Sequence, residues 1–225
     1  MKYLLDTANL ADIRRFYDIF PIAGVTSNPS IVKREGNVDF FAHMKEIRSI
    51  IGPEKALHIQ VTALDTEGML KDADTILEKV DPVVYVKVPV TMEGIKAIRL
   101  MKQNGIRVTG TVVYSKQQGF LAMEAGADFI APYFNRMENL GIDPDDVIAS
   151  LAEMIALYDY PTQILAASFK NAGQVDRAFL AGAQTATMDP SILEGMLAQS
   201  HITGAVDAFD ADWKSIHGNT LICDL

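Results

Sequence analysis

Apolar segments typical of β-strands recur along the whole chain and alternate with segments of helical periodicity. The strand-like segments begin near Tyr3, Ile22, Leu57, Val83, Ile106, Asp128, Gln163 and Gln184. Among the helical segments, Ile148, Leu151, Ile155 and Tyr158 follow one another at spacings that place them on one helix face. About eight strands that alternate with helices, at intervals of roughly 20 to 35 residues, are typical of an α/β protein with a (β/α)8 barrel, the TIM barrel.

Signals for the ends of helices support this order. Asp143-Pro144 and Asp189-Pro190 each combine an N-cap residue with proline at the first helical position, so a helix is predicted after each pair. Gly105, Gly126 and Gly182 each precede a predicted strand, where glycine can end the preceding helix. A doubly wound open sheet is the main alternative. It would carry a glycine-rich phosphate loop after an early strand, and none is present.

The chain is expected to form a single barrel domain, residues 1–225. No low-complexity tract, charge block or linker divides it. The segment 201–225 lies beyond the eighth strand–helix unit and contains Phe209 and Trp213. This segment predicts an extra amphipathic C-terminal helix and tail, which packs on its own barrel or on a neighbouring subunit.

The overall charge argues against two classes of partner. The 225 residues carry a net charge of −9, whereas nucleic acids and anionic membranes bind basic surfaces. A small phosphorylated ligand is compatible with this charge, because it needs only a few local cations. No apolar run approaches the roughly 20 residues of a membrane span. Asp6 ends the first apolar run too early for a signal peptide.

The cysteine and histidine content bears on the compartment and on cofactors. Cys223 is the only cysteine, which rules out an intrachain disulfide and a cysteine-based metal site. The four histidines are scattered and lack the spacing of metal ligands. We therefore expect a cytoplasmic protein that uses neither a metal ion nor a cofactor.

One lysine stands in a segment where burial is expected. Residues 83–88 are β-branched or aromatic apart from Lys87, and Pro82 and Pro89 flank them. Burial of an ammonium group is costly and lowers the pKa of the lysine instead. A neutral amine can attack a carbonyl group and form a Schiff base. The alternative is a lysine at a strand end whose head reaches into water.

Polar residues follow the predicted carboxyl ends of the strands, where barrel enzymes carry their active sites. These residues are Asp6, Thr26, Asn28, Gln60, Thr62, Lys87, Thr109, Thr111, Tyr133, Asn135, Arg136, Ser168 and Lys170. Each alone has an ordinary explanation: Asp6 as a helix cap, Tyr133 as a core residue, or Arg136 as a surface charge. Their occurrence at one end of one barrel predicts a site.

The residue types suggest roles within this site. Lys87 is the nucleophilic amine, and Asp6 is placed to exchange protons near it. The neutral side chains of Asn28, Thr111 and Ser168 are suited to the hydroxyl groups of a sugar. Arg136 and Lys170 supply positive charge for a phosphate group.

Several of these residues stand in motifs of a known family. Gly24-Val25-Thr26-Ser27-Asn28-Pro29-Ser30-Ile31-Val32 resembles the first transaldolase signature, and Val86-Lys87-Val88-Pro89 with Thr91 and Glu93-Gly94 resembles the second. Further matches are Leu5-Asp6-Thr7, Gly110-Thr111, Ala131-Pro132-Tyr133, Asn135-Arg136 and Ala166-Ala167-Ser168-Phe169-Lys170. The resemblance covers essentially the whole chain, whose length is similar to that of the compact subfamily of transaldolases and fructose-6-phosphate aldolases.

This resemblance implies a class I, metal-free aldolase on a (β/α)8 barrel. By resemblance, Lys87 would form the Schiff base with C2 of the ketose, and Asp6 and Asn28 would lie beside it. Thr111 would help to hold the catalytic water, and Arg136, Ser168 and Lys170 would contact phosphate. The resemblance also implies a homo-oligomer, a pentameric ring or a decamer, in which the C-terminal helix reaches a neighbouring subunit.

Two positions bear on the choice of activity. Transaldolases carry glutamate where this chain has Gln60, and tend to carry phenylalanine where it has Tyr133, so both residues resemble the fructose-6-phosphate aldolase pattern. A glutamine orients water but does not titrate, and a tyrosine hydroxyl could then take over part of the proton transfer. Cleavage of fructose 6-phosphate to dihydroxyacetone and glyceraldehyde 3-phosphate is therefore expected. The alternatives are a transaldolase of the pentose phosphate pathway and a sugar-phosphate binder without turnover.

Overall fold

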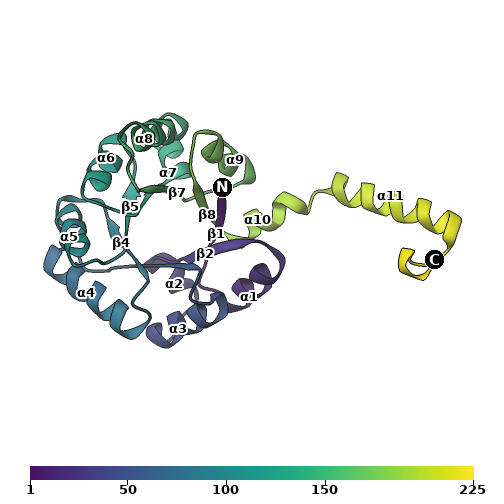
Figure 1. Ribbon diagram of the computed structural model, residues 1–225, viewed down its shortest axis with the longest axis horizontal. Coiled ribbons are helices and arrows are strands. Elements are labelled where there is room, and N and C mark those ends of the chain that lie inside the picture. Colours follow the sequence, from purple (N-terminus) through teal and green to yellow (C-terminus); the bar gives the residue numbers. More distant parts are fainter.

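The computed structural model describes all 225 residues, Met1 to Leu225. Eight parallel strands pair in the order of the chain and close into a barrel, with β8 beside β1 (Figure 1). The strands are β1 Lys2–Asp6, β2 Ile22–Thr26, β3 Ala56–Gln60, β4 Tyr85–Pro89, β5 Val108–Val113, β6 Phe129–Pro132, β7 Gln163–Ala166 and β8 Thr185–Met188. The predicted (β/α)8 barrel is thus confirmed.

Helices surround the barrel and connect its strands (Figure 1). The helices are α1 Leu10–Ile19, α2 Pro29–Arg34, α3 Phe40–Ile51, α4 Thr66–Lys79, α5 Met92–Gln103, α6 Lys116–Glu124, α7 Phe134–Asn139, α8 Pro144–Tyr158, α9 Ala172–Leu180, α10 Pro190–Leu197 and α11 Ser200–His217. A short 3₁₀ helix, η1 Ile222–Asp224, ends the chain. Helix α11 is the predicted extra C-terminal helix.

The predicted helix signals act as expected. The side chain of Asp143 accepts hydrogen bonds from the first turn of α8, and that of Asp189 caps α10 in the same way. Gly105, Gly126 and Gly182 have φ angles of 73°, 92° and 106°. These values lie in the left-handed region that glycine adopts without steric cost, so each glycine can turn the chain from a helix into the next strand.

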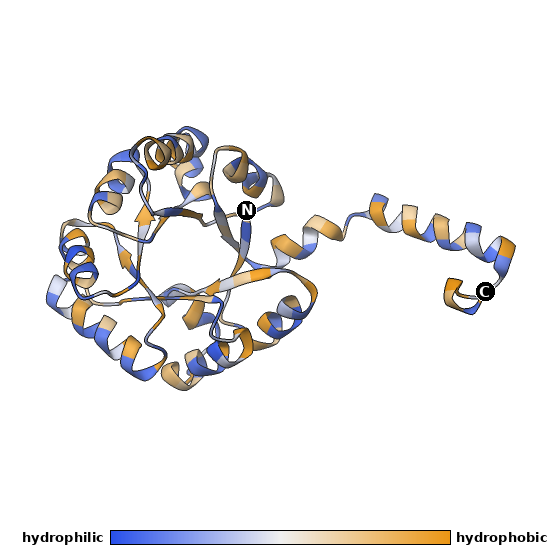
Figure 2. Cartoon of the chain, viewed as in Figure 1, coloured by the Kyte–Doolittle hydropathy of each residue, from blue (hydrophilic) through white to orange (hydrophobic).

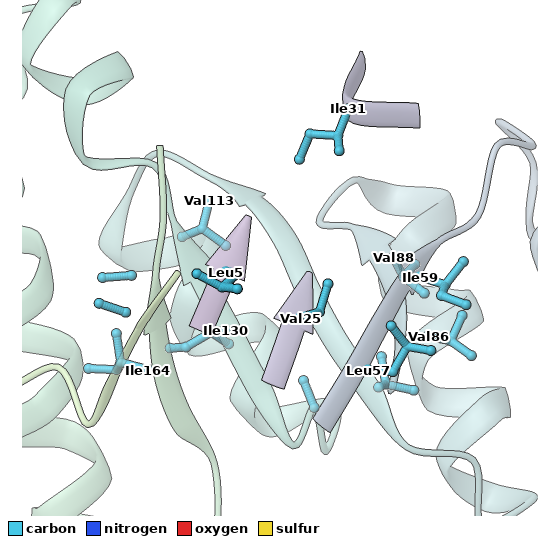
Figure 3. Packing of buried hydrophobic residues seen from close by; sticks show 14 of the residues in the cluster. Leu5, Val25, Ile31, Leu57, Ile59, Val86, Val88, Val113, Ile130 and Ile164 are labelled. Atoms are coloured by element: carbon cyan, nitrogen blue, oxygen red, sulfur yellow. The ribbon is translucent and has the colours of Figure 1, made fainter. Parts of the chain in front are cut away.

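The main hydrophobic core lies between the barrel wall and the helices. Figure 3 shows outward-facing strand residues such as Val25, Ile59, Val86 and Val88, which are all essentially inaccessible to solvent. Successive residues of a strand point to opposite faces of the sheet. Val86 and Val88 therefore face the helices, and Lys87 between them faces the barrel interior.

The strand that carries Lys87 begins later than predicted. The apolar run suggested a strand from Val83, whereas β4 begins at Tyr85. The backbone N–H of Val83 donates to the side chain of Asp81 at 2.9 Å, and the N–H of Val84 donates to the Asp81 carbonyl at 3.3 Å. These bonds form a turn around Pro82 that takes Val83 out of the ladder.

Helix α11 extends away from the barrel (Figure 1), and none of its residues is buried. Figure 2 shows apolar and polar residues alternating along it. Trp213 contacts its own segment instead of the barrel: its ring stacks on His217, and its indole N–H donates to the Thr220 carbonyl at 2.8 Å. The expected packing of this segment on its own barrel is therefore not found. None of the helices combines the length and the apolar character needed to cross a bilayer.

Candidate active site

A cavity of about 330 Å³ opens at the carboxyl ends of the strands. Residues from six of the eight strand ends or the loops after them line it: Asp6, Asn28, Ser30, Ile31, Arg34, Lys87, Tyr133, Asn135, Arg136, Asn139, Ala167, Ser168, Phe169, Lys170, Thr187, Met188 and Asp189. The cavity brings together eight of the thirteen polar residues that the sequence predicts at the strand ends. Thr26, Gln60, Thr62, Thr109 and Thr111 lie outside its lining.

Lys87 lies at the bottom of this cavity. Its side chain points inward from β4, and only 3% of the residue is exposed to solvent. The Nζ donates a hydrogen bond to the carbonyl of Ser27 at 3.0 Å. Burial lowers the pKa of Lys87, and the negative charge of Asp6 offsets part of this effect. Lys87 is therefore a buried amine and not a lysine whose head reaches water.

Asp6 accepts a hydrogen bond from Thr26 on β2, and Thr187 on β8 extends this chain of hydroxyl groups. The Thr26 hydroxyl donates to the Asp6 carboxylate at 2.6 Å and lies 2.7 Å from the Thr187 hydroxyl. Because Thr26 uses its single proton toward Asp6, Thr187 is the donor in the second bond. Burial raises the pKa of Asp6, and the charge of Lys87 and the bond from Thr26 counteract part of that rise. Thr26 thus supports Asp6 from below the cavity.

Tyr133 and Thr111 form a second pair of hydroxyl groups. Their oxygens lie 2.9 Å apart, and both residues are buried. Burial raises the pKa of Tyr133, against the effect of the bond to Thr111. The phenol is therefore protonated at neutral pH and can donate a hydrogen bond into the cavity. Thr111 does not line the cavity itself, and its hydroxyl is linked to the cavity through Tyr133.

Strained backbone shapes this part of the site. Val112 has a φ of 62°, where a β-branched side chain is strongly disfavoured, and the pairing of β5 with β6 shifts register at this point. The side chain of Gln118 bridges the irregularity. Its amide donates to the carbonyls of Val90 at 2.9 Å and Val112 at 3.1 Å, and its oxygen accepts from the N–H of Tyr114 at 2.9 Å.

Cationic side chains gather on the side of the cavity formed by β6, β7 and the loops after them. The guanidinium of Arg136 lies over the Tyr133 ring at 4.9 Å and donates to the Tyr114 hydroxyl at 3.3 Å. Lys170 and Ser168 line the same cavity. Ser168 has a φ of 64°, so strained backbone occurs here as well. This side of the cavity is suited to an anionic group.

Asn28 lies across the cavity as the N-cap of α2. Its side-chain oxygen accepts a hydrogen bond from the N–H of Ile31 at 3.1 Å. This bond fixes the orientation of the amide, so its NH2 group is available to an acceptor such as a sugar oxygen.

Gln60 occupies a different position from the one predicted. It is opposite Lys87 in the β3–β4 pairing, but its side chain lines two smaller cavities of about 250 and 300 Å³ beside the main one. Its Oε1 is buried and accepts no hydrogen bond from the protein. A buried acceptor of this kind can be satisfied by a water molecule.

Arg34 and Asp189 also line the main cavity, and the sequence pattern did not single them out as site residues. Their side chains form an ion pair at 3.8 Å. The sequence predicts Asp189 only as a helix cap, and it does cap α10. Arg34 is the last residue of α2, whose first four residues belong to the first signature. Its place two residues beyond that signature is the only signal in the sequence.

The arrangement combines a buried amine, a carboxylate, a phenol and cationic side chains in one cavity. The shifts in pKa favour an uncharged amine on Lys87 and a proton on Tyr133. Such a site can form an imine with a carbonyl compound and exchange protons with it. No group of three or more His, Cys, Asp or Glu side chains is arranged so that it could hold a metal ion.

Comparison with known structures bears on the fold alone. The chain resembles the crystal structure of dihydrodipicolinate synthase from Rhodopseudomonas palustris, with a TM-score of 0.62 and 14% identity over 93% of this chain and 78% of that one. At this identity the likeness supports the barrel and says nothing about the reaction.

Comparison with known sequences is more specific. The chain is 46% identical over 222 residues to a probable fructose-6-phosphate aldolase of Streptococcus pneumoniae (strain ATCC 700669 / Spain 23F-1), which covers 99% of this chain and 100% of that protein. The family model for transaldolase/fructose-6-phosphate aldolase matches residues 3–220. The match confirms the resemblance carried by the two signatures. The protein belongs to the transaldolase/fructose-6-phosphate aldolase family.

Proposed function

We propose that the protein is a class I aldolase that cleaves fructose 6-phosphate, reversibly, into dihydroxyacetone and glyceraldehyde 3-phosphate. The observation that carries this proposal is the buried amine of Lys87, whose pKa is lowered by burial, in one cavity with Asp6 and Tyr133. The name of the relative from Streptococcus pneumoniae supports the choice of substrate.

In the proposed reaction, the neutral amine of Lys87 attacks C2 of the ketose, and loss of water forms a protonated imine. Removal of a proton from the hydroxyl on C4 breaks the bond between C3 and C4 and releases glyceraldehyde 3-phosphate. The electron pair of that bond forms an enamine with C2. Protonation of C3, followed by hydrolysis of the imine, releases dihydroxyacetone and restores the amine.

The side chains around Lys87 are assigned by their chemistry. Asp6, with a raised pKa, can accept and return protons during formation of the imine. Tyr133, hydrogen-bonded to Thr111, is assigned the transfer of the proton between the C4 hydroxyl and C3. Gln60 is assigned to a water molecule at its buried oxygen, used in hydrolysis.

The remaining assignments concern binding. Thr26 holds Asp6, and Asn28 contacts the hydroxyl groups of the dihydroxyacetone part. Arg136, Ser168 and Lys170 are assigned to the phosphate group, because they line the same cavity as Lys87 and two of them are cationic. A sugar phosphate then spans the distance from the cations to the amine.

Transaldolase activity is the second candidate, because the family contains both activities. A transaldolase keeps the dihydroxyacetone unit bound until an aldose phosphate accepts it, whereas an aldolase releases it to water. The test is to measure glyceraldehyde 3-phosphate released from fructose 6-phosphate alone, and then with erythrose 4-phosphate added. Steady release without the acceptor is expected. Release only with the acceptor would indicate a transaldolase.

A sugar-phosphate binder without turnover is the third candidate. The variant Lys87→Met separates it from both enzymes, because loss of the amine should abolish turnover and leave a pure binder unaffected. Cleavage of fructose 6-phosphate by Lys87→Met at the wild-type rate would refute the Schiff-base mechanism.

We further propose that the protein is a cytoplasmic homo-oligomer, a pentamer or a decamer, in which α11 docks on a neighbouring subunit. The support is a stripe of apolar residues along α11, formed by Ile202, Val206, Phe209, Trp213 and Ile216. Their spacing alternates between four and three residues, so they share one helix face. Phe209 is 73% and Ile216 is 76% exposed, although such a stripe normally packs against a partner.

A further inference from the structure

A second cavity lies at the amino-terminal mouth of the barrel, at the opposite end of the strands from the active-site cavity. Its volume is about 200 Å³, and it shares no lining residue with the active-site cavity. Lys2 on β1 and Tyr85 on β4 line it at the beginning of their strands. Leu4, Phe129 and Leu165 form a small apolar cluster, with Tyr85 packed against it, near this mouth. The two cavities are therefore separate sites.

Three cationic side chains surround this mouth cavity. Lys2, Lys55 and Arg107 line it together with a single carboxylate, that of Glu54. None of the three cations forms an ion pair with a carboxylate. Such a concentration of unpaired positive charge is unusual for a chain with a net charge of −9.

Compensation of helix dipoles does not account for these cations. The carboxyl ends of the barrel helices point to this side of the molecule, and cations in a last helical turn would interact favourably with them. Lys2, however, is the first residue of β1, and Lys55 and Arg107 each directly precede a strand. Lys2 lies on the same face of β1 as Leu4 and Asp6, and Arg107 lies on the same face as Thr109, two residues further along. Lys2 and Arg107 therefore belong to the interior face of the barrel.

Two of the cations lie over aromatic rings, one inside the cavity lining and one on α1. The Arg107 guanidinium lies over the Tyr85 ring at 5.4 Å, and the Lys55 ammonium lies over the Tyr17 ring at 5.7 Å. The Tyr85 ring in turn meets the Phe129 ring edge to face at 5.0 Å. Arg107 makes only a long bond of 3.5 Å, to the Val83 carbonyl, so its hydrogen-bond donors are largely uncommitted.

We propose that this mouth cavity is a second, non-catalytic anion site that binds inorganic phosphate or a compact phosphate monoester through Lys2, Lys55 and Arg107. Three cations and one carboxylate leave a local charge that matches the roughly −1.5 to −2 of a phosphate monoester at neutral pH. The cavity is smaller than the roughly 300–1,000 Å³ of sites for drug-sized ligands, so a compact ligand is required. The aromatic floor favours a ligand with a short carbon body over a bare ion.

Equilibrium dialysis with labelled inorganic phosphate tests this site in the full-length protein. Two double variants are compared with the wild type: Lys55→Gln with Arg107→Gln at the mouth, and Arg136→Gln with Lys170→Gln at the active-site cavity. Both pairs remove two positive charges, so they are matched in net charge. The mouth variant should lose one of two classes of binding site, with a fall in affinity of at least about tenfold, as expected for loss of charge-assisted contacts. The active-site variant should keep that class.

The same comparison can overturn the proposal. Phosphate binding by the mouth variant that equals the wild type, or complete loss of binding in the active-site variant, would show that no mouth site exists. Should the mouth variant fail to fold, a phosphate titration of the wild type followed by NMR takes its place. The ring resonances of Tyr85 and Phe129 should then shift, and their constancy at saturating phosphate would refute the site.

Glycerol 3-phosphate distinguishes the two sources of the phosphate group. If glycerol 3-phosphate displaces the labelled phosphate more strongly than unlabelled inorganic phosphate does, the site is a monoester site. Equal or weaker displacement identifies a site for inorganic phosphate. The site is independent of the aldolase proposal, because the mouth variant leaves every residue of the active-site cavity unchanged. The rate of fructose 6-phosphate cleavage by the mouth variant, measured in a buffer free of inorganic phosphate, should equal that of the wild type.

Discussion

The Nζ of Lys87 donates a hydrogen bond to the carbonyl oxygen of Ser27, across the barrel interior from β4 to the end of β2, at 3.0 Å. Ser27 is itself fixed, because its backbone N–H donates to the carbonyl of His58 on β3 at 3.0 Å. A carbonyl orients the amine but offers no full negative charge to stabilise an ammonium ion. The protonation of Lys87 therefore depends on burial and on Asp6.

The first prediction concerns the pH dependence of imine formation in the variant Asp6→Asn. The carboxylate of Asp6 raises the pKa of Lys87 and opposes the effect of burial. Its removal should lower that pKa, so the neutral amine persists to lower pH and the acid limb of the profile moves to lower pH. The measurement is the rate of borohydride trapping with fructose 6-phosphate between about pH 5 and 9.

The trapped adduct also identifies the nucleophile. Mass spectrometry should locate it at Lys87, and the variant Lys170→Met should still be labelled there. An acid limb that moves to higher pH would contradict the electrostatic role of Asp6. A label on Lys116 or Lys170 would contradict the assignment of Lys87.

The second prediction concerns the phenol of Tyr133. The variant Tyr133→Phe removes only the hydroxyl that contacts Thr111, so kcat for cleavage should fall by about 10² to 10⁴, the usual contribution of a general acid–base group. Tyr114→Phe is the matched control, because Tyr114 packs against the Tyr133 ring at 5.7 Å and loses only the hydroxyl that contacts Arg136. A similar loss of kcat in both variants would show that Tyr133 acts through packing and not as a proton donor.

The third prediction concerns the support of the strained backbone at Val112. The variant Gln118→Leu leaves the carbonyls of Val90 and Val112 and the N–H of Tyr114 without their partner. The free energy of unfolding should fall by about 1–3 kcal/mol in urea denaturation, and kcat should fall because Thr111 adjoins Val112.

Gln117 provides the control for this experiment, since it is the exposed neighbour of Gln118. Gln117→Leu should change stability by no more than about 0.5 kcal/mol. Equal stability and kcat of the two variants would show that the bridging amide does not support the site.

The fourth prediction concerns the acid sensitivity of the fold. His58 is fully buried, stacks on Tyr85 at 4.8 Å and contacts the Thr109 hydroxyl at 2.9 Å. Burial lowers the pKa of His58 well below 6.5, and the charge of Lys87 adds to this effect. Because the folded-state pKa is lowered, the unfolded chain binds a proton that the folded chain does not. Stability is then complete above pH 6.5 and declines as the pH falls below it.

The decline should be about 1.4 kcal/mol for each pH unit below the unfolded pKa. The variant His58→Phe keeps an aromatic ring and removes the titrating group, so it should lack this component. Urea denaturation of both proteins at about pH 7 and pH 5 gives the difference. An identical loss of stability in the variant would show that His58 does not titrate on unfolding.

The fifth prediction concerns the apolar stripe of α11. The double variant Phe209→Glu with Ile216→Glu introduces two carboxylates on the stripe. It should dissociate the proposed oligomer, because burial of unpaired charge is costly. Two carboxylates on the opposite face, Ala211→Glu with Ser215→Glu, should leave it intact. Light scattering gives the mass of each. A wild-type protein that is monomeric, or an oligomer unaffected by the stripe variant, would contradict the role of α11.

Much of the fold and part of the site follow from local sequence. The alternation of strands and helices, the caps at Asp143 and Asp189 and the turns at Gly105, Gly126 and Gly182 depend on residues that are close in the chain, and all are found as predicted. The inward position of Lys87 also follows, because the two-residue period of a strand places it opposite to Val86 and Val88.

Tertiary structure alone decided which polar groups meet. Barrel closure brings Arg34 beside Asp189 and gathers the cations of the amino-terminal mouth, although these residues are far apart in the chain. It also directs Gln60 toward neighbouring cavities and leaves α11 without contact to its own barrel. The physical reason is that periodicity determines the face and the end on which a residue lies. The distances between remote side chains depend on how all eight strands pack and close.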